Sequence, residues 1–264
     1  MKIAVITGGS SGIGKELCAL CANAGYKIYE LSRHGEDSAG IIHITADVSD
    51  QMSLKSAFEK ISSEERGIDL LINNAGIGIS GSAENTEYTD AMKQIKVNFI
   101  GMYLCCSFAM PLLRNNKGRI INLSSVAAVL PIPFQSFYSA SKGAINAFSL
   151  ALRNEVRDFG ISVCAVMPGD VCTGFTDARI KSSKGNEVYE SRIGRSVSVM
   201  EHDEKNGMSA EYAARKIFDI SQKRNVAPLY TIGNKYKLLV FISRFLPVSA
   251  INRIVYSLYS GNSK

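Results

Sequence analysis

The glycine-rich segment TGGSSGIG, residues 7–14, constrains the fold more than any other feature of this chain of 264 residues. A short apolar run at 2–7, typical of a buried β-strand, precedes it, and a helical pattern at 13–24 follows it. Glycines let the backbone approach a pyrophosphate closely, and the free N–H groups at a helix start attract an anion. This context indicates a nucleotide-binding turn, although the spacing T-G-x-x-x-G-x-G departs from the usual G-x-G-x-x-G.

Short apolar segments alternate with helical patterns along most of the chain. Strands are predicted at 2–7, 28–31, 41–45, 70–72, 119–123 and 161–166, and helices at 13–24, at 88–113 with a break near Pro111, and through Tyr138 to Asp158. The alternation predicts an α/β fold, a doubly wound parallel sheet with helices on both faces in a single domain. The composition, 46% hydrophobic and 20% charged residues, is that of a globular protein with a substantial core.

The cysteines and histidines indicate which cellular compartment and which kinds of disulfide or metal site to expect. The six cysteines lack the spacing of a disulfide framework, and we expect Cys172 in a loop and the other five thiols to be buried. This usage fits a reducing compartment, and the N-terminal apolar run is too short for a signal peptide, so a cytoplasmic location is expected. The three histidines show no metal-ligand spacing, and no metal site is expected.

The net charge of +6 is concentrated near the end of the chain. Residues 220–264 include seven basic and no acidic residues, which leaves the rest of the chain close to neutral. A single basic tail without an aromatic RNA-binding motif is weak evidence for nucleic acid, so no nucleic-acid partner is expected.

Tyr138 and Lys142 stand at positions i and i+4 of a predicted helix, so their side chains share one face with Cβ atoms about 6 Å apart. A neighbouring ammonium favours an ionised phenol and lowers its pKa, which would let Tyr138 act as a general acid or base near neutral pH. Ser125 lies thirteen residues earlier and could offer a hydroxyl to the same substrate oxygen. A Tyr-x-x-x-Lys pair alone is more often an ordinary exposed pair, so other motifs must decide.

Further motifs follow in a fixed order: TGGSSGIG (7–14), ADV (46–48), NNAG (73–76), Asn98, Ser125, YSASK (138–142) and PGDVCT (168–173). In type, order and spacing they resemble the short-chain dehydrogenase/reductases, over residues 2–233. The resemblance implies a Rossmann-type catalytic domain at 1–233 with a seventh strand at 229–232 and a substrate lid near 174–206. It also implies a homodimer or homotetramer. Residues 234–264, which lie beyond the resemblance, are expected to form a C-terminal amphipathic helical extension.

The resemblance implies a role for each motif residue. Tyr138 would be the acid/base, Lys142 would bind the nicotinamide ribose, Ser125 would hold the substrate oxygen, and Asn98 would help to hold a water-mediated proton relay. Besides Tyr138 and Lys142, the residues expected to bind the cofactor are Gly8, Ser10, Ser11, Gly12, Ile13, Gly14, Arg33, Asp47, Val48, Asn74, Ala75, Gly76, Pro168, Gly169, Val171 and Thr173.

The choice of cofactor depends on the end of the second predicted strand. Ser32 stands where NAD-dependent relatives place an aspartate for the adenosine ribose, and Arg33 follows it. A carboxylate would repel a 2′-phosphate and an arginine attracts it, so we expect NADP(H). Ser11 occupies the place at which some NADP users carry a basic residue. A surface role for Arg33 and dual specificity therefore stay open.

The residues expected around the substrate are mostly apolar: Ile77, Ile79, Ala128, Ile132, Phe134, Val171 and Phe175. Such a pocket favours a lipophilic alcohol or ketone over a sugar, although packing in the core explains any one of these residues equally well. We therefore expect an NADP(H)-dependent oxidoreductase that interconverts a ketone and a secondary alcohol on a small hydrophobic substrate, with a hydroxysteroid as one candidate. The alternatives are a reductase of acyl-carrier-bound 3-ketoacyl groups and a non-catalytic NADP(H)-sensing protein.

Two apolar patterns with the spacing i, i+3, i+4 and i+7 lie near the end of the chain, on either side of Pro247: Leu238, Phe241, Ile242 and Phe245, then Ile251, Ile254, Val255 and Leu258. They predict two short amphipathic helices, too interrupted by arginine to span a membrane. With the excess of basic charge, these helices could make a peripheral contact with anionic lipid. Packing over the pocket mouth or against a second subunit is the preferred interpretation.

Overall fold

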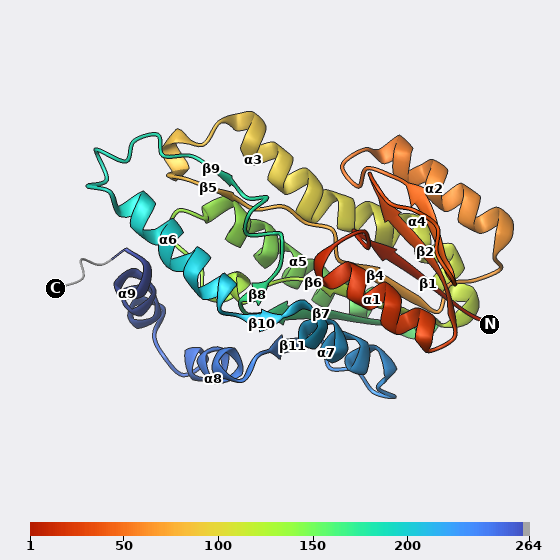
Figure 1. Cartoon of the computed structure of the whole chain (residues 1–264). Coiled ribbons are helices and arrows are strands. Elements are labelled where there is room, and N and C mark those ends of the chain that lie inside the picture. Colours follow the sequence, from red (N-terminus) through yellow and green to blue (C-terminus); the bar gives the residue numbers. More distant parts are fainter. Residues whose placement is uncertain (261–264) are drawn as a thin grey trace.

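A computed structural model describes residues 1–260 and shows a seven-stranded parallel sheet with helices packed on both faces (Figure 1). The strand order is β11-β7-β6-β4-β1-β2-β3. The predicted fold class is confirmed, and the ends of the seven predicted strands differ from the observed ones by at most two residues. The observed strands are β1 (Lys2–Thr7), β2 (Tyr26–Ser32), β3 (Ile41–Thr45), β4 (Leu70–Asn73), β6 (Arg119–Leu123), β7 (Ser162–Pro168) and β11 (Leu229–Ile232).

Each central strand is buried on both faces, which explains its nearly continuous apolar sequence. In β1, Ile3 and Val5 pack in one core cluster, and Ala4 and Ile6 pack in the other. The first cluster is closed by α2 (Gln51–Glu64), α4 (Gly101–Asn116) and α5 (Ser136–Glu155), and the second by α1 (Gly12–Asn23) and α7 (Ala210–Gln222). The alternation of side chains along each strand therefore builds two cores from one sheet.

One long helical segment departs from its prediction. The break expected near Pro111 is wrong, since α4 continues through this proline to Asn116. The irregularity lies earlier, where a π turn at Lys96–Ile100 joins α3 (Tyr88–Ile95) to α4. A π turn inserts one residue into a helix and often lies near a functional site, and Asn98 is buried at its centre.

The same segment, Tyr88–Asn116, is long and apolar enough by composition to cross a membrane. Its α4 part packs against α2, β4 and β6, and its α3 part contacts α5. About 44% of its most apolar stretch is buried inside the domain. Length and composition alone are therefore weak evidence that this segment spans a membrane.

One short parallel strand pair attaches the segment 174–206 to the rest of the domain, and a second pair joins the residues on either side of the segment. β5 (Ile79–Ser80) pairs with β9 (Ile180–Lys181), and β8 (Val171–Cys172) pairs with β10 (Met208–Ser209). The remaining helices are α6 (Arg192–Lys205), α8 (Asn234–Ser243) and α9 (Val248–Tyr259), with short 3-10 turns at Ala83–Asn85, Val126–Ala128 and Arg157–Phe159. The boundary at 233 and the lid at 174–206 stay predictions.

The cysteines lie as their sequence context predicts. Five thiols are buried and Cys172 is exposed on β8. Burial raises the pKa of all five buried thiols, that of Cys106 to about 12.

Candidate active site

The strand order reverses between β1 and β4, because the chain runs from β1 outward to β3 and then returns to the other side of β1. In an open parallel sheet this reversal leaves a crevice beyond the carboxyl ends of the strands. A cavity of about 560 Å³ occurs there, and the β1–α1 turn, the ends of β2, β4, β6 and β7, and residues of α5, α8 and α9 line it.

Most of the predicted site residues meet in this cavity. Its walls include Ser125, Tyr138 and Lys142 together with Gly8, Ser10, Ser11, Gly12, Ile13, Arg33, Asp47, Val48, Asn74, Ala75, Gly76, Pro168, Gly169, Val171 and Thr173. Two predicted residues, Gly14 and Asn98, are not among the lining residues and lie behind the walls. Gly14 and Asn98 therefore support the residues that face the cavity.

The glycine turn depends on close backbone approach at its two ends. Gly8 and Gly12 have positive φ angles of 67° and 52°, which glycine adopts without strain. A Cβ on Gly14 would lie 2.1 Å from the carbonyl oxygen of Gly8, so only glycine lets α1 start this close to the turn. The Asn74 side-chain amide donates to the carbonyl oxygens of Thr7 and Gly8, both at 3.0 Å, and fixes the turn against the end of β4.

A buried carboxylate that sequence reasoning missed also holds this turn. Glu30 Oε1 accepts a hydrogen bond from the backbone N–H of Gly9 at 2.8 Å, and its Oε2 lies 2.6 Å from His43 Nδ1. Glu30 is almost fully buried in β2. A carboxylate within a buried strand needs polar partners. An acidic residue inside a predicted strand was therefore the signal in the sequence that could have identified Glu30.

Arg33, which follows the end of β2, lies near Asp47 at the wall of the cavity. Burial raises the pKa of Asp47, but hydrogen bonds from Ser49 and the charges of Arg33 and Lys93 outweigh it and leave the pKa below its usual value. Lys93 on α3 also lines the cavity, and the sequence motifs give no sign of it. This end of the cavity therefore carries two cations.

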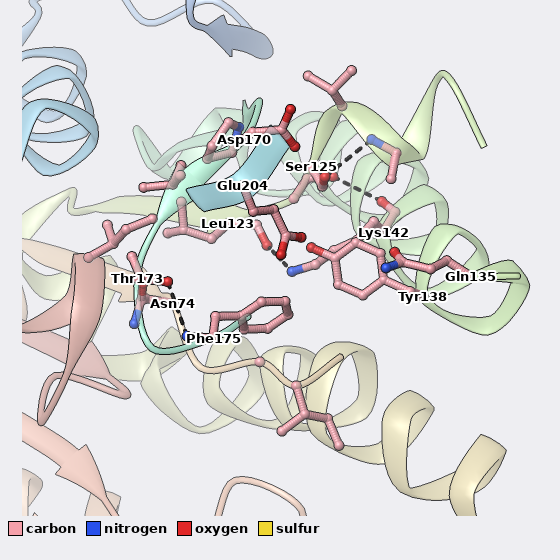
Figure 2. Close-up of a pocket in the computed structure, with 18 of the residues that line it drawn as sticks. Asn74, Leu123, Ser125, Gln135, Tyr138, Lys142, Asp170, Thr173, Phe175 and Glu204 are labelled. Carbon is pink, nitrogen blue, oxygen red and sulfur yellow. Dashed lines mark hydrogen bonds between the residues drawn. The ribbon is translucent and has the colours of Figure 1, made fainter. Parts of the chain in front are cut away.

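Tyr138 and Lys142 lie one turn apart on α5, and Ser125 faces them from the turn after β6 (Figure 2). Lys142 Nζ lies 5.6 Å from the centre of the Tyr138 ring and donates to the carbonyl oxygen of Leu123 at 2.8 Å. Ser125 Oγ accepts a hydrogen bond from the backbone N–H of Ala127 at 3.1 Å, and its hydroxyl lies close enough to Tyr138 to lower the pKa of the phenol. The geometry thus brings two hydroxyl groups together beside one ammonium.

Burial controls the ionisation of this group. Burial raises the pKa of Tyr138 to about 12, with the nearby Ser125 hydroxyl opposing this shift and the charge of Glu204 adding to it. Burial also lowers the pKa of Lys142 to about 8. The prediction that Lys142 makes Tyr138 acidic is therefore wrong here, because desolvation of both groups dominates and Nζ is directed at the Leu123 carbonyl.

Asn98 connects α5 to the end of β4 from behind the cavity wall. Its Oδ1 accepts from the N–H of Ile77 at 2.8 Å, and its Nδ2 donates to the carbonyl of Ile77 at 3.0 Å and to Ser141 Oγ at 3.1 Å. Ser141 Oγ in turn donates to the carbonyl oxygen of Tyr138 at 2.7 Å. Asn98 thus positions the backbone that carries the tyrosine.

The wall opposite Tyr138 comes from the segment predicted as a lid. The Phe175 ring lies 6.0 Å from the Tyr138 ring, and Glu204 on α6 points toward Tyr138 (Figure 2). Glu204 accepts from Thr176 Oγ1 at 2.7 Å and is ion-paired with Arg179, which is almost fully buried. Sequence reasoning did not single out Glu204, because its position depends on how the segment folds back.

A second carboxylate, Asp170, lines the cavity from the turn after β7 and accepts a hydrogen bond from the Tyr236 hydroxyl. Burial raises the pKa of Asp170, with Asp203 and Glu204 adding to the effect and Tyr236 opposing it.

The apolar residues predicted around the substrate divide into two groups. Ile77, Ile132, Val171 and Phe175 line the cavity, whereas Ile79, Ala128 and Phe134 do not. Both tail helices and the turn between them contribute further apolar lining that the sequence placed there only as one alternative: Leu239, Ile242, Leu246, Ile251, Ile254, Val255 and Leu258.

Comparison with known proteins identifies the class. Residues 2–184 match the family model described as short chain dehydrogenase. The chain is 40% identical over 228 residues to a 3-ketodihydrosphingosine reductase of Bacteroides thetaiotaomicron, covering 85% of each protein. It is 37% identical to a short-chain type dehydrogenase/reductase, VdlC, of Helicobacter pylori, covering 94% of each. The chain belongs to the short-chain dehydrogenase/reductase family and is an oxidoreductase of that type.

Solved structures share the fold. A short-chain dehydrogenase from Streptomyces avermitilis superposes with a TM-score of 0.84 over 97% of this chain and 95% of its own, at 22% identity. Other structures of this fold contain NADP or NADH. The family uses a nicotinamide cofactor. Gly8 and Gly12 line the cavity with positive φ angles and no side chains, so that the backbone of the turn is open to a ligand and the residues present fit such a group.

Proposed function

We propose that this oxidoreductase uses NADPH to reduce a ketone on a long-chain lipid to a secondary alcohol. The observation that carries the proposal is the shape of the cavity, which joins the hydroxyl groups of Ser125 and Tyr138 to an apolar end built by α8 and α9. A long alkyl chain removes the most water from such a wall. The name of the Bacteroides relative, a 3-ketodihydrosphingosine reductase, supports this substrate class.

In this proposal each residue of the chain has a separate role at the carbonyl group of the substrate. A bound reduced nicotinamide supplies the hydride to the carbonyl carbon. The hydroxyl of Tyr138, whose pKa of about 12 keeps it protonated at neutral pH, gives its proton to the carbonyl oxygen. The Ser125 hydroxyl donates a hydrogen bond to the same oxygen, which stabilises the negative charge that develops there.

Lys142 and Asn98 support the reacting groups in this proposal. The ammonium of Lys142 would bind the ribose of the cofactor. Its positive charge would also balance the negative charge that forms as Tyr138 loses its proton. Asn98 holds the start of α5 through Ser141, so that Tyr138 keeps its orientation. A proton relay through water at Asn98 remains part of the proposal.

The preference for NADPH over NADH is proposed from charge. The charges of Arg33 and Lys93 both lower the pKa of Asp47, and both side chains line the cavity at its adenosine end. Two cations favour the additional phosphate of NADP. A cytoplasmic location and a homodimer or homotetramer also remain proposals from the sequence and the resemblance.

A substrate panel tests the proposal. Purified protein is incubated with NADPH and either 3-ketodihydrosphingosine, a steroid ketone or a 3-oxoacyl thioester, and oxidation of NADPH is followed. The proposal requires the highest kcat/KM on the long-chain ketone. A preference for the steroid or the thioester would replace that substrate class, and binding of NADPH without turnover on any of them would support a sensor.

A further inference from the structure

The two tail helices carry the same apolar spacing but direct it to different surroundings. The apolar positions of α9, Ile251, Ile254, Val255 and Leu258, all line the cavity. On α8 and just beyond it, the side chains of Leu238, Phe241 and Phe245 are 59%, 56% and 73% exposed and do not line it. The rings of Phe241 and Phe245 contact each other edge to face, 5.2 Å apart.

This exposed surface is continuous with the mouth of the cavity. Ile242, Ile254 and Leu258 belong to both, since each lines the cavity and is more than 40% exposed. We call the six exposed apolar side chains Leu238, Phe241, Ile242, Phe245, Ile254 and Leu258 the tail patch. In Figure 1 the helices that carry it lie at one end of the molecule, where α9 contacts α6.

The charged side chains on the helices that carry the tail patch have one sign, although α9 also packs near acidic residues of α6. Lys235, Lys237, Arg244 and Arg253 are exposed on α8, α9 and the turn between them. No acidic residue occurs anywhere in 220–264, and seven basic residues do. An apolar patch bordered by basic side chains fits a surface that is anionic outside and apolar beneath.

We propose that the tail patch docks on an anionic phospholipid bilayer, with the mouth of the cavity held against the acyl boundary. The exposed phenylalanines would enter the interfacial region, and the basic side chains would lie among the lipid phosphates. A lipid ketone could then pass from the bilayer into the cavity along Ile242, Ile254 and Leu258 without crossing water. Membrane docking does not depend on which ketone is reduced.

The same charges disfavour a second copy of the chain as the occupant. A symmetric contact through the tail patch would bring Lys237 and Arg244 of both copies close together. Residues 220–264 offer no carboxylate to neutralise them. An anionic lipid surface neutralises them directly.

Flotation with lipid vesicles tests the proposal on the full chain. We expect binding to phosphatidylcholine vesicles that contain about one third phosphatidylglycerol, at least tenfold weaker binding to pure phosphatidylcholine, and loss of binding as salt is raised from about 0.1 M to about 1 M. Equal binding to both vesicle types, or no binding to either, would overturn the proposal.

Two sets of variants separate docking from folding. We expect Leu238→Ser/Phe241→Ser/Phe245→Ser to lose at least tenfold in vesicle binding, while the control Met52→Ser/Tyr88→Ser/Val188→Ser, at equally exposed apolar positions elsewhere, changes it less than twofold. We expect Lys237→Gln/Arg244→Gln to lose about fivefold per charge, and Lys60→Gln/Arg66→Gln to lose little.

NADPH affinity, measured on each variant, shows that the domain is folded. Equal losses in the test and control variants would overturn the proposal. The proposal would also be overturned if the original chain forms a dimer and binds no vesicles while the serine variant is a monomer. That result would assign the patch to a second copy.

Discussion

The two ends of the cavity are built in different ways. At the nucleotide end, buried hydrogen bonds hold the backbone: Asn74 binds two carbonyl groups of the glycine turn and Glu30 binds the N–H of Gly9. At the substrate end, the walls are apolar side chains of α8 and α9, many of them partly exposed. Hydrogen bonds to backbone fix positions to within tenths of an ångström, whereas apolar contacts tolerate changes of shape. The nucleotide end is therefore the rigid part of the site.

The largest expected effect lies between the two ends. Tyr138→Phe removes the hydroxyl that donates the proton but keeps the ring, so we expect turnover to fall about 10²–10⁴-fold while NADPH affinity changes less than about twofold. Steady-state kinetics and a fluorescence titration with NADPH measure the two quantities. Retained turnover would contradict the assignment of Tyr138.

The rigidity of the nucleotide end predicts a strong response to one methyl group. Gly14→Ala places a Cβ against the carbonyl oxygen of Gly8, and we expect the free energy of unfolding to fall by about 1–3 kcal/mol together with NADPH affinity. Gly174→Ala, where nothing lies within 4 Å of the added atom, is the matched control at the substrate end and should be nearly neutral. Chemical denaturation measures both, and equal losses would break the comparison.

The pH dependence of reduction tests how burial shifts the pKa values of Tyr138 and Lys142. The lysine, with its pKa lowered to about 8, loses its proton before the tyrosine, with its pKa raised to about 12. If the positive charge is needed, kcat/KM falls about tenfold per pH unit as the pH rises above 8. Lys142→Arg keeps the charge and should move this limb to higher pH. An unchanged limb in that variant would assign it to another group.

The cofactor preference should respond at the nucleotide end alone. Arg33→Ala removes one of two cations, and we expect the Kd for NADPH to rise about tenfold with little change for NADH. Isothermal titration with both nucleotides measures the ratio. Equal weakening of the two would indicate a general loss of structure and not recognition of the 2′-phosphate.

The smallest effect is expected at the adaptable substrate end. Leu246→Ala removes part of one apolar wall, and we expect KM for a long-chain ketone to rise only about three- to tenfold, with NADPH affinity unchanged. A short ketone that does not reach α8 and α9 serves as the control substrate. A loss on the short ketone of the same size would place Leu246 in a structural role.

The strands, and the residues that line the cavity around the glycine turn, could be predicted because they depend on local sequence. Apolar runs of the right length, bounded by turn residues, predicted six strands of the sheet, and the family resemblance added the seventh at 229–232. Residues such as Gly8 and Asn74 lie in motifs tied to those strands. The π turn at 96–100 could not be predicted, since the visible signal was Pro111 and the actual irregularity depends on how Asn98 contacts Ile77 and Ser141. Glu204 was missed for a similar reason, because tertiary contacts place it opposite Tyr138.

The tail helices show the limit of periodicity most clearly. The pattern i, i+3, i+4, i+7 correctly predicted that α8 and α9 each have an apolar face. It could not say that the face of α9 lines the cavity while most of the face of α8 meets solvent. Periodicity identifies a face, and only the packing of the chain identifies what the face contacts.

The distribution of thiols has a practical consequence. Cys172 is exposed and lies next to Thr173 at the cavity, whereas burial keeps the other five cysteines protonated and inaccessible. Because maleimides react with accessible thiolates, the unmodified chain can be labelled at a single position. A fluorophore attached there would report, in stopped-flow experiments, the arrival of nucleotide and of lipid as separate kinetic phases.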